Sequence, residues 1–343
     1  MIRYIDGNLL DANTEALVNT VNCVGVMGKG IALQFKQAFP DNFRQYARAC
    51  RRGDVRIGKM FVVPVVGIHG PKYIINFPTK IHWRDPSRIE FIEEGLEDLV
   101  ACIQGHGIRS VAIPPLGCGN GGLEWERVRP LIEKRMSSLN DVEIYVYPPK
   151  KSPEARQMKV GTKEPKLTLS RAALLELMDR YLLLGYSLSR LEVQKLAYFL
   201  QAAGQDLKLN FVAHKFGPYA RELNYVLQDM EGHFIRGFGD GSARTEIIVL
   251  SEARQRVHEL LETDAETRSH VERAQYMIYG FETPYGMELL STVHWVLVHH
   301  PEAREDVNIA IRQVHEWNER KRKLFPPSHI QIAVEHLQEV GIM

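Results

Sequence analysis

The sequence predicts a three-layer α/β/α domain followed by a mainly α-helical second domain. Up to about residue 149, short runs rich in β-branched and aromatic residues alternate with helical patterns, which is typical of a sheet covered by helices on both faces. A segment with few apolar residues and several prolines and lysines follows. Beyond it, apolar residues recur at helical spacing almost throughout. We therefore expect an α/β domain at residues 1–150, a linker at 151–166 and a helical domain at 167–343.

The elements expected in the first domain are short. Helical patterns follow Gly30, cover residues 89–103 with a clear apolar stripe, and cover residues 125–132. Ser87-x-x-Glu90 predicts a capping box at the start of the second of these helices. The strands are expected at residues 2–5, 16–21, 60–66, 73–77, 111–113 and 142–147.

The second domain is expected to consist mostly of helices. Ser189-x-x-Glu192 predicts a capping box, and Gly185 and Gly204 stand where glycine commonly ends a helix. The helices are expected at residues 169–184, 191–203, 219–230, 252–261, 265–279, 287–298, 303–317 and 330–340, with β-like runs at 210–213 and 246–250.

The composition excludes several classes of protein. The formal net charge is +1, so the whole chain is not strongly attracted to nucleic acid or to a membrane surface, and a polyanion must meet a local patch. No apolar run approaches the roughly 20 residues of a membrane span, and we expect no signal peptide. The four cysteines form no Cys-x-x-Cys pair, which is typical of free thiols in a reducing compartment. We expect a cytoplasmic protein.

Two glycine-rich loops each leave a predicted strand and enter a predicted helix. Loop one is Asn19-Thr20-Val21-Asn22-Cys23-Val24-Gly25-Val26-Met27-Gly28-Lys29-Gly30, and loop two is Pro114-Pro115-Leu116-Gly117-Cys118-Gly119-Asn120-Gly121-Gly122. Glycine lets the backbone approach a ligand closely, and a helix N-terminus favours an anion. Two such loops in one domain indicate a diphosphate held between them. Neither loop contains G-x-G-x-x-G or G-x-x-x-x-G-K-[ST], which disfavours NAD-dependent hydride transfer and nucleoside triphosphate hydrolysis.

A third stretch, Asn76-Phe77-Pro78-Thr79-Lys80-Ile81-His82-Trp83, lies between the two loops in the chain. It brings a lysine to the end of a predicted strand. Read alone, Lys80 is a surface lysine after a Pro-Thr turn. Read with the glycine loops, it suggests chemistry on a phosphate-bearing substrate.

These motifs resemble the ADP-ribose-binding loops of macrodomains. The resemblance rests on Asp6-Gly7-Asn8-Leu9-Leu10, on Val18-Asn19-Thr20-Val21-Asn22, on Gly28-Lys29-Gly30-Ile31-Ala32 and on Gly117-Cys118-Gly119, in the same order. The stretch from Asn76 to Trp83 is similar to the DarG family, the antitoxins of systems in which a DarT-type toxin ADP-ribosylates thymidine in single-stranded DNA. The resemblance covers roughly the first 150 residues strongly and the remainder more loosely.

The resemblance implies an ADP-ribose site with four parts. Most macrodomains carry aspartate where this sequence has Asn8, which accepts a hydrogen bond without a charge and would select adenine less strongly. The implied contacts are Asn8 and Leu9 for adenine; Thr20, Val21 and Asn22 for the distal ribose; Gly30, Ile31 and Ala32 with Leu116, Gly117, Cys118, Gly119, Asn120, Gly121 and Gly122 for the diphosphate; and Thr79 with Lys80 at the reacting end.

Lys80 and Asn22 are the catalytic residues that the resemblance implies. In the related terminal ADP-ribose glycohydrolases that Lys80 resembles, the lysine amine attacks the anomeric carbon. Those enzymes also use an aspartate in a Gly-Cys-Gly-Leu-Asp run, whereas this sequence has Gly117-Cys118-Gly119-Asn120-Gly121, so the general acid or base stays open. A nucleophilic lysine must be neutral, yet a diphosphate favours the ammonium form. Lys80 therefore acts either as a nucleophile or as a cation that polarises the leaving group.

Several other residues have two readings. Trp83 is a possible base contact or an anchor for its loop. Asn22 binds ribose or caps the turn after it. Cys118 is expected to be a small packing residue, not a nucleophile. The histidines His294, His299 and His300 have no metal-ligand spacing and are expected on helix surfaces, so neither a metal nor a cofactor is predicted. The basic run Arg320-Lys321-Arg322-Lys323 is expected to be a solvated helix end.

The second domain resembles the Panacea type of antitoxin module. The similarity rests on Lys195-Leu196-Ala197-Tyr198-Phe199 and on His214-Lys215-Phe216-Gly217-Pro218, and an apolar helix stripe with a Gly-Pro turn is the alternative reading. The expected partners are ADP-ribosylated single-stranded DNA and a cognate DarT-type toxin, with no membrane and no metal. The resemblance implies an antitoxin that removes ADP-ribose from thymidine in single-stranded DNA through its macrodomain and binds and inhibits the toxin through its C-terminal domain. Three alternatives stay open: a non-catalytic ADP-ribose reader, a hydrolase of another ADP-ribose derivative, and a toxin-binding protein with an inactive macrodomain.

Overall fold

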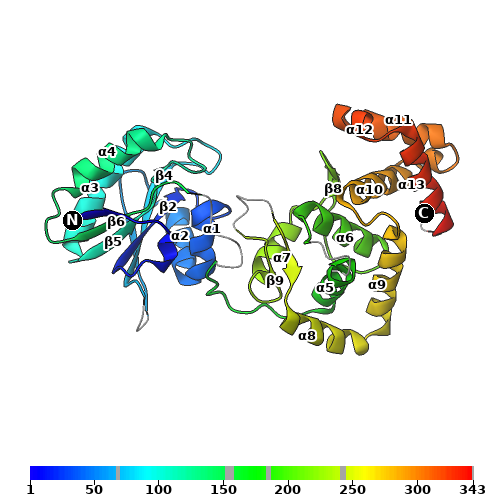
Figure 1. The fold of residues 1–343 in the computed structure, drawn as a ribbon, viewed down its shortest axis with the longest axis horizontal. Helices are drawn as coiled ribbons and strands as arrows, with labels where there is room; N and C mark the ends of the chain where they lie inside the picture. The colour runs from blue at the N-terminus through cyan, green and yellow to red at the C-terminus, as the bar shows by residue number, and fades with distance from the viewer. Residues whose placement is uncertain (67–69, 151–157, 183–186, 240–244, 342–343) are drawn as a thin grey trace. The chain divides into compact units, whose positions relative to one another are not determined.

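A computed structural model describes residues 1–66, 70–150, 158–182, 187–239 and 245–341 (Figure 1). The chain forms two compact units, unit 1 built on Met1–Lys163 and unit 2 built on Glu164–Phe238 and Arg244–Met343. Residues 151–157 of the expected linker and the expected helix-ending Gly185 lie outside the described residues. The expected fold classes, an α/β sheet domain and a mainly helical domain, are confirmed.

Unit 1 contains a six-stranded sheet in the order β1-β6-β5-β2-β4-β3. All neighbouring pairs are parallel except β3–β4, which is antiparallel at one edge. Each of the six expected strands is present. The bounds are β1 Ile2–Tyr4, β2 Ala16–Asn22, β3 Phe61–Pro64, β4 Tyr73–Lys80, β5 Ser110–Ile113 and β6 Glu143–Val146.

Helices cover both faces of this sheet (Figure 1). On β2, Ala16 and Val18 face α3 and α4, whereas Leu17 between them faces the side that carries α1. This alternation follows from the two-residue period of a strand. Each face is therefore sealed by its own apolar cluster. The helices are α1 Gly30–Ala38, α2 Pro40–Arg52, α3 Ile89–Gly105 and α4 Trp125–Met136, with a short 3-10 helix, η1 Leu9–Asp11.

Two expectations for unit 1 need correction. Helix α2 was not predicted, because its apolar positions are few, although Tyr46 and Ala49 pack in the core of the unit. The capping box at Ser87 and Glu90 is wrong. Arg88 stands at the N-cap of α3 without a side-chain hydrogen bond, and the buried Ser87 hydroxyl has no hydrogen-bond partner among the described residues. The physical reason is that Ser87 is packed against loop two.

The end of unit 1 includes part of the segment that was expected to be a linker. Met158 is buried, and Lys159 Nζ donates to the carbonyl of Leu10 at 2.8 Å. The Gly161 amide donates to Gln37 O at 2.8 Å. These contacts attach residues 158–161 to the α1 side of unit 1.

Unit 2 is mainly helical. Its central helix, α10, is buried on almost all sides, which is typical of a helix inside a helical domain. The capping box at Ser189 is confirmed: the Ser189 hydroxyl accepts from the Glu192 amide, and the Glu192 carboxylate accepts from the Ser189 amide. The helices are α5 Leu169–Leu182, α6 Arg190–Ala202, α7 Leu223–Met230, α8 Ser251–Glu262, α9 Ala265–Ile278, α10 Pro284–His299, η3 Pro301–Arg304, α11 Val307–Trp317, α12 Glu319–Leu324 and α13 Pro327–Glu339.

Two small antiparallel pairs interrupt the helices: β7 Val212–His214 with β8 Gly217–Tyr219, and β9 Ile235–Arg236 with β10 Ile248–Val249. Strand β8 lies where a helix was expected to begin. Lys195 Nζ on α6 donates to the Pro218 carbonyl on β8 at 2.7 Å. The two halves of the Panacea-like motif therefore contact each other and attach the β7–β8 hairpin to α6.

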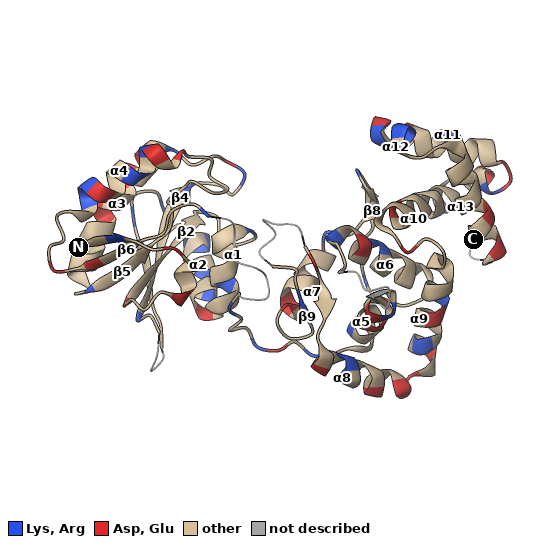
Figure 2. Ribbon diagram, viewed as in Figure 1, with Lys and Arg blue, Asp and Glu red and all other residues tan. Residues whose placement is uncertain are grey.

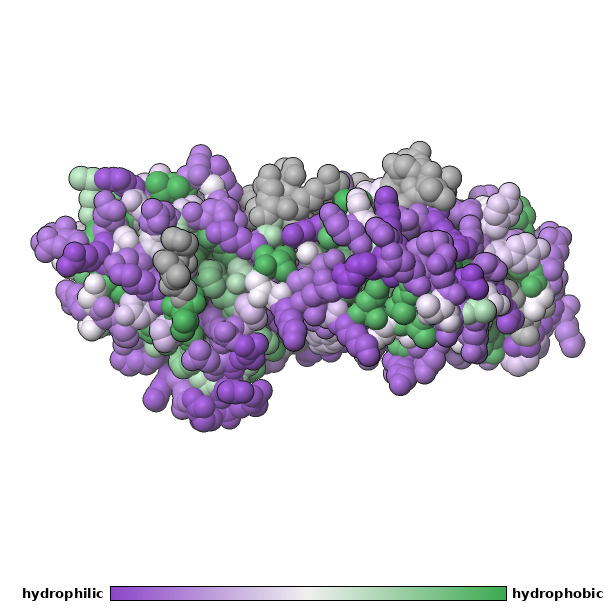
Figure 3. All heavy atoms as spheres, turned by 90° about the horizontal axis from the view of Figure 1, so that it is seen from below, coloured by the Kyte–Doolittle hydropathy of each residue, from purple (hydrophilic) through white to green (hydrophobic). Residues whose placement is uncertain are grey.

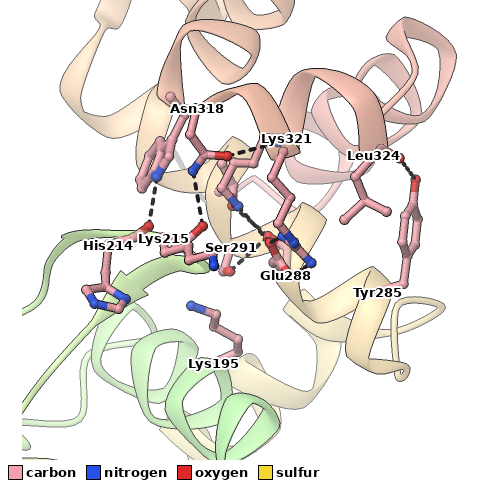
Figure 4. Close-up of polar contacts among 12 residues, drawn as sticks. Lys195, His214, Lys215, Tyr285, Glu288, Ser291, Asn318, Lys321 and Leu324 are labelled. Carbon is pink, nitrogen blue, oxygen red and sulfur yellow. Dashed lines mark hydrogen bonds and ion pairs between the residues drawn. The ribbon is translucent and has the colours of Figure 1, made fainter.

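A buried ionic cluster joins α10 to α12 in unit 2 (Figure 4). Arg320 makes two hydrogen bonds to the Glu288 carboxylate, and Lys321 Nζ donates to Glu288 Oε1 at 3.0 Å and to Thr292 Oγ1 at 2.9 Å. Lys321 is fully buried, so the expectation of a solvated basic run is wrong at this position. Burial lowers the pKa of Lys321 to about 8, although Glu288 acts in the opposite direction.

The histidine expectation also needs correction. His294 is 5% exposed, and its Nδ1 lies 2.7 Å from the Tyr198 hydroxyl. Burial lowers the pKa of His294 to about 4, so it is neutral at physiological pH. It is a packed core residue and not a surface residue. Among the described residues, no group of three His, Cys, Asp or Glu side chains is arranged to hold a metal ion.

Candidate active site

The candidate site lies at the carboxyl ends of β2 and β4. These parallel strands pair residue by residue from Ala16 with Tyr73 onward, and an irregularity after Val21 brings Asn22 opposite Lys80. Thr79 is therefore the extra residue, and its hydroxyl lies 3.5 Å from Val21 O. Strand β4 continues three residues beyond the expected end because the chain stays extended through Pro78. The two residues implied in catalysis are thus cross-strand neighbours.

The Lys80 amine is turned toward loop two. The residue is 9% exposed, and Nζ donates to the backbone carbonyl of Asn120 at 2.9 Å. Burial lowers the pKa of this amine below its ordinary value, and the charge of Asp85 acts weakly in the opposite direction. A larger fraction of Lys80 is therefore neutral near pH 7 than for an exposed lysine.

Loop one is organised by Asn22. Its Nδ2 donates to Val26 O at 2.6 Å, and its Oδ1 accepts from the amides of Val24 at 3.0 Å and Val26 at 3.3 Å. The buried Tyr46 hydroxyl donates to Asn22 O at 2.6 Å. The turn-capping reading of Asn22 is therefore observed, while its contact with a ribose stays a prediction. Tyr46 was missed because it belongs to the helix that the sequence pattern did not reveal.

The two glycine loops approach each other at Gly30 and Asn120. A methyl group on Gly30 would lie 2.8 Å from the Asn120 amide nitrogen Nδ2. Gly30 has a φ of 60°, in the left-handed region that favours glycine. It begins α1, whose N-cap residue Lys29 provides no side-chain hydrogen bond. Gly30 therefore brings the start of α1 next to loop two. Ile31 and Ala32 pack against the apolar clusters of unit 1, and the contact of these three residues with a diphosphate stays a prediction.

Two backbone carbonyls of loop two accept hydrogen bonds from residues outside the loop. Asn120 O accepts from Lys80 Nζ, and Gly121 O accepts from the Ser87 amide at 2.9 Å. In a trans peptide the C=O and N–H point in opposite directions, so the Gly121 amide points away from Lys80. Within the described part of the chain, the amides of Gly119, Asn120 and Gly121 have no hydrogen-bond acceptor. They are the donors that an anion would use.

The other residues of loop two are packed or turned inward. Leu116 and Gly117 are buried, and Gly117 and Gly122 have φ values of 71° and 80°. The Cys118 thiol donates to Leu116 O at 3.5 Å, and burial raises its pKa to about 11. A thiol with a raised pKa is a poor nucleophile, which agrees with a packing role for Cys118.

Gly121→Ala is expected to disrupt loop two. A methyl group there would lie 2.3 Å from both Gly117 O and Ser87 Oγ, so the backbone must move. We expect the free energy of unfolding to fall by about 1–3 kcal/mol and the affinity for ADP-ribose to fall at least about tenfold. Calorimetry and ADP-ribose titration measure these effects. Gly119→Ala is the matched control for stability, because Gly119 has no atom within 4 Å of an added methyl and no positive φ. An equal loss of stability in both variants would contradict the packing argument.

Asn8 and Leu9 lie at the start of η1. Asn8 Oδ1 accepts from the Leu10 amide at 3.1 Å, and Leu9 is buried in the cluster that contains Phe35. Asn8 therefore caps a turn in this structure, and its contact with adenine stays a prediction. Trp83 is 42% exposed and lies three residues beyond Lys80, the last residue of β4. Ser87 was assigned by sequence to a helix cap and emerges instead as a support of loop two.

The fold and the site define a class of protein. A mixed sheet between helix layers, with two glycine loops and a lysine at the carboxyl ends of its strands, is the arrangement expected for a macrodomain. Residues 18–132 match the family model described as the Macro domain. This stretch contains most of β2, all of β4 and β5, and both glycine loops.

Relatives identify the particular family. The chain is 50% identical over 343 residues to the DNA ADP-ribosyl glycohydrolase of Thermus aquaticus, covering 100% of this chain and 94% of the relative. The chain belongs to the DNA ADP-ribosyl glycohydrolase family, the DarG family.

Two further similarities each cover less than half of the chain. A DNA ADP-ribosyl transferase-DNA ADP-ribosyl glycohydrolase fusion protein of Thermosipho africanus is 33% identical over 171 residues, 45% of this chain and 44% of the fusion. The solved macrodomain of Mycobacterium tuberculosis DarG is 59% identical and covers 44% of this chain and 99% of that one, with a TM-score of 0.43.

Proposed function

We propose that the macrodomain of this chain hydrolyses the N-glycosidic bond between ADP-ribose and thymidine in single-stranded DNA, and that unit 2 binds a cognate DarT-type toxin. Family membership supports DNA ADP-ribosyl glycohydrolase activity. The single observation that carries the proposal is the Lys80 amine, which is nearly buried and lies 2.9 Å from loop two at the point where the loops approach each other.

In the proposed pose, each part of ADP-ribose contacts a different segment of unit 1. Adenine lies near Asn8 and Leu9, and the diphosphate lies between the start of α1 and the free amides of loop two. The distal ribose lies beside Thr20, Val21 and Asn22. This order leaves the anomeric carbon at the Lys80 end of the site, beside Thr79.

The net reaction adds water across one bond. The bond between the anomeric carbon and the base nitrogen breaks, the carbon receives the hydroxyl of water, and the nitrogen receives the proton. The neutral Lys80 amine acts as a nucleophile on the anomeric carbon, or the protonated amine polarises the departing base. The lowered pKa of Lys80 favours the nucleophile.

The pH dependence distinguishes these two roles. If the neutral amine reacts, kcat/KM rises about tenfold per pH unit up to the pKa of the free enzyme, which burial places below the ordinary 10.5, and then levels off. The bound diphosphate stabilises the ammonium form, so we expect the rising limb of kcat at higher pH than that of kcat/KM. Rates that fall as pH rises through this limb would assign the cationic role instead. Steady-state kinetics on a modified oligonucleotide measure both profiles.

The proposed activity is tested with a single-stranded oligonucleotide that carries ADP-ribose on thymidine. We expect release of unmodified DNA and free ADP-ribose. Binding without release would favour a reader, and release only from an acylated ribose or a modified carboxylate would favour another substrate class.

The fused relative, in which a transferase and a glycohydrolase share one chain, supports a DarT-type transferase as the partner. The assignment of toxin binding to unit 2 rests on the resemblance of unit 2 to the Panacea type of antitoxin module. It is tested by co-purification of the full chain carrying Lys80→Ala with a DarT-type transferase, because that variant separates binding from repair. Failure to co-purify would contradict the proposal for unit 2 alone.

The surface of the described residues carries many charged and hydrophilic side chains. Lys and Arg are interspersed with Asp and Glu on α4 and α8, whereas the charged residues of α3 are all acidic (Figure 2). The face shown in Figure 3 is mostly hydrophilic, with small apolar areas. Within the described residues, every helix is too short or too polar to traverse a lipid bilayer.

A further inference from the structure

The proposed substrate continues beyond the ADP-ribose site, because the sugar is attached to a base within a DNA strand. The strand must leave the site at the Lys80 end. We propose that residues 81–88 and the adjoining tip of loop one bind this single strand, with Trp83 stacked on the base of a nucleotide that flanks the modified thymidine. This inference rests on the proposed function.

A tight turn presents the proposed stacking residue. The Asp85 amide donates to His82 O at 3.1 Å, and the Arg84 amide donates to His82 Nδ1 at 3.3 Å. Trp83 and Arg84 therefore occupy the two central positions of a turn, where side chains project from the surface. The turn begins two residues after Lys80.

Trp83 is placed as a platform and not as an anchor. It belongs to none of the hydrophobic clusters of the described residues and is 42% exposed. Its ring contacts the His82 ring, with 5.3 Å between centroids, and the Arg84 guanidinium, 4.6 Å from the indole centroid. An exposed indole beside a cation is the combination that single-stranded nucleic acid binders use for stacking.

The neighbouring surface has further exposed apolar side chains. Ile81 is 55% exposed, and its carbonyl accepts from the Cys23 amide at 2.9 Å, which joins this segment to loop one. In loop one, Val24 and Val26 are 45% and 40% exposed. Single exposed apolar residues need no explanation, but these gather with Trp83 on two hydrogen-bonded segments.

The charges favour a polyanion as the occupant. Arg84 and Arg88 are exposed in the segment, and Lys29 is exposed in loop one, whereas Asp85 is the exposed carboxylate of residues 81–88. The chain as a whole has a net charge of only +1, so this is a local excess. Cations and an aromatic ring together match the phosphates and bases of a single strand.

The stacking contact is tested with Trp83→Ala and Trp83→Phe on two substrates, an ADP-ribosylated oligonucleotide and ADP-ribosylated thymidine without flanking nucleotides. We expect Trp83→Ala to lower kcat/KM about tenfold on the oligonucleotide only. Trp83→Phe is expected to keep most of the wild-type kcat/KM on the oligonucleotide, because phenylalanine can still stack on a base. Affinity for free ADP-ribose is expected to stay unchanged. Tyr4→Ala is the control, because Tyr4 is 45% exposed on β1 at the opposite edge of the sheet.

Two outcomes overturn the stacking assignment: wild-type kinetics in Trp83→Ala, or an equal loss on both substrates. If wild type releases ADP-ribose from neither substrate, the proposed function fails, which is a different result. The phosphate contacts are tested with Arg84→Gln and Arg88→Gln, each expected to reduce the slope of log KM against log salt by about 0.7. An unchanged slope, or a loss of toxin binding with intact oligonucleotide kinetics, assigns the surface to another partner and overturns the inference.

Discussion

Lys80→Ala is expected to abolish release of ADP-ribose from modified DNA, with kcat lowered by about 10²–10⁴-fold. The reason is that this amine is the proposed reactive group, and β4 places it where both glycine loops meet, opposite Asn22 in the strand register. The measurement is single-turnover release of unmodified oligonucleotide.

The same substitution is expected to leave ADP-ribose binding within a few-fold of wild type, because the proposed diphosphate contacts are made by the amides of loop two. Some loss follows from the missing hydrogen bond to Asn120 O, which helps to orient the loop. Lys72→Ala is the matched control, because Lys72 lies just before the other end of β4 and makes an exposed ion pair with Glu15. Its activity is expected to equal wild type.

Lys80→Arg sharpens the result. Arginine keeps a positive charge but is not deprotonated in proteins, so it cannot act as a nucleophile. If both Lys80→Arg and Lys80→Ala lose nearly all glycohydrolase activity, the result supports nucleophilic attack by the Lys80 amine. If Lys80→Arg keeps substantial activity, the result supports polarisation of the leaving base by a positive charge. Activity of Lys80→Ala close to wild type would remove Lys80 from the mechanism.

Much of unit 1 follows from local sequence patterns. Glycine loops between strand and helix patterns predict where backbone amides gather, and parallel strands place their carboxyl ends at one edge. The position of Lys80 beside loop two therefore follows from short-range signals. The extension of β4 through Pro78 does not, because proline usually marks the end of a strand pattern.

The errors have a common physical cause. Ser87 reads as a helix cap because its sequence neighbours fit that role, but its packing against Gly117 and Gly121 depends on residues 30 or more positions away. His294 and Lys321 read as surface residues because their partners, Tyr198 and Glu288, lie 96 and 33 positions away in the chain. Contacts across a fold decide the burial of a polar side chain, and one sequence does not reveal them.

Glu288→Gln is expected to give the largest loss of stability in unit 2, lowering the free energy of unfolding by about 3–5 kcal/mol. Glu288 is 3% exposed and binds both Arg320 and the fully buried Lys321 (Figure 4). Without the carboxylate, Lys321 loses its ion pair, although it keeps its hydrogen bond to Thr292. It also lies near the buried amine of Lys195, whose pKa is lowered to about 7 by burial and by the charge of Lys321. Calorimetry of the full chain measures the loss as a lowered transition of unit 2.

The matched control is Glu319→Gln, which removes a carboxylate from an ion pair with Lys323 in which both side chains are 76% exposed. We expect a change below about 1 kcal/mol there. The double variant Glu288→Met with Lys321→Met is expected to recover most of the stability lost in Glu288→Gln, because it removes the stranded charge together with its partner. In this double variant water solvates the Arg320 guanidinium, because its side chain is 38% exposed. A double variant that is less stable than Glu288→Gln would contradict this explanation. The stability lost in Glu288→Gln would then come from the lost attraction within the cluster and not from the cost of an unpaired buried charge.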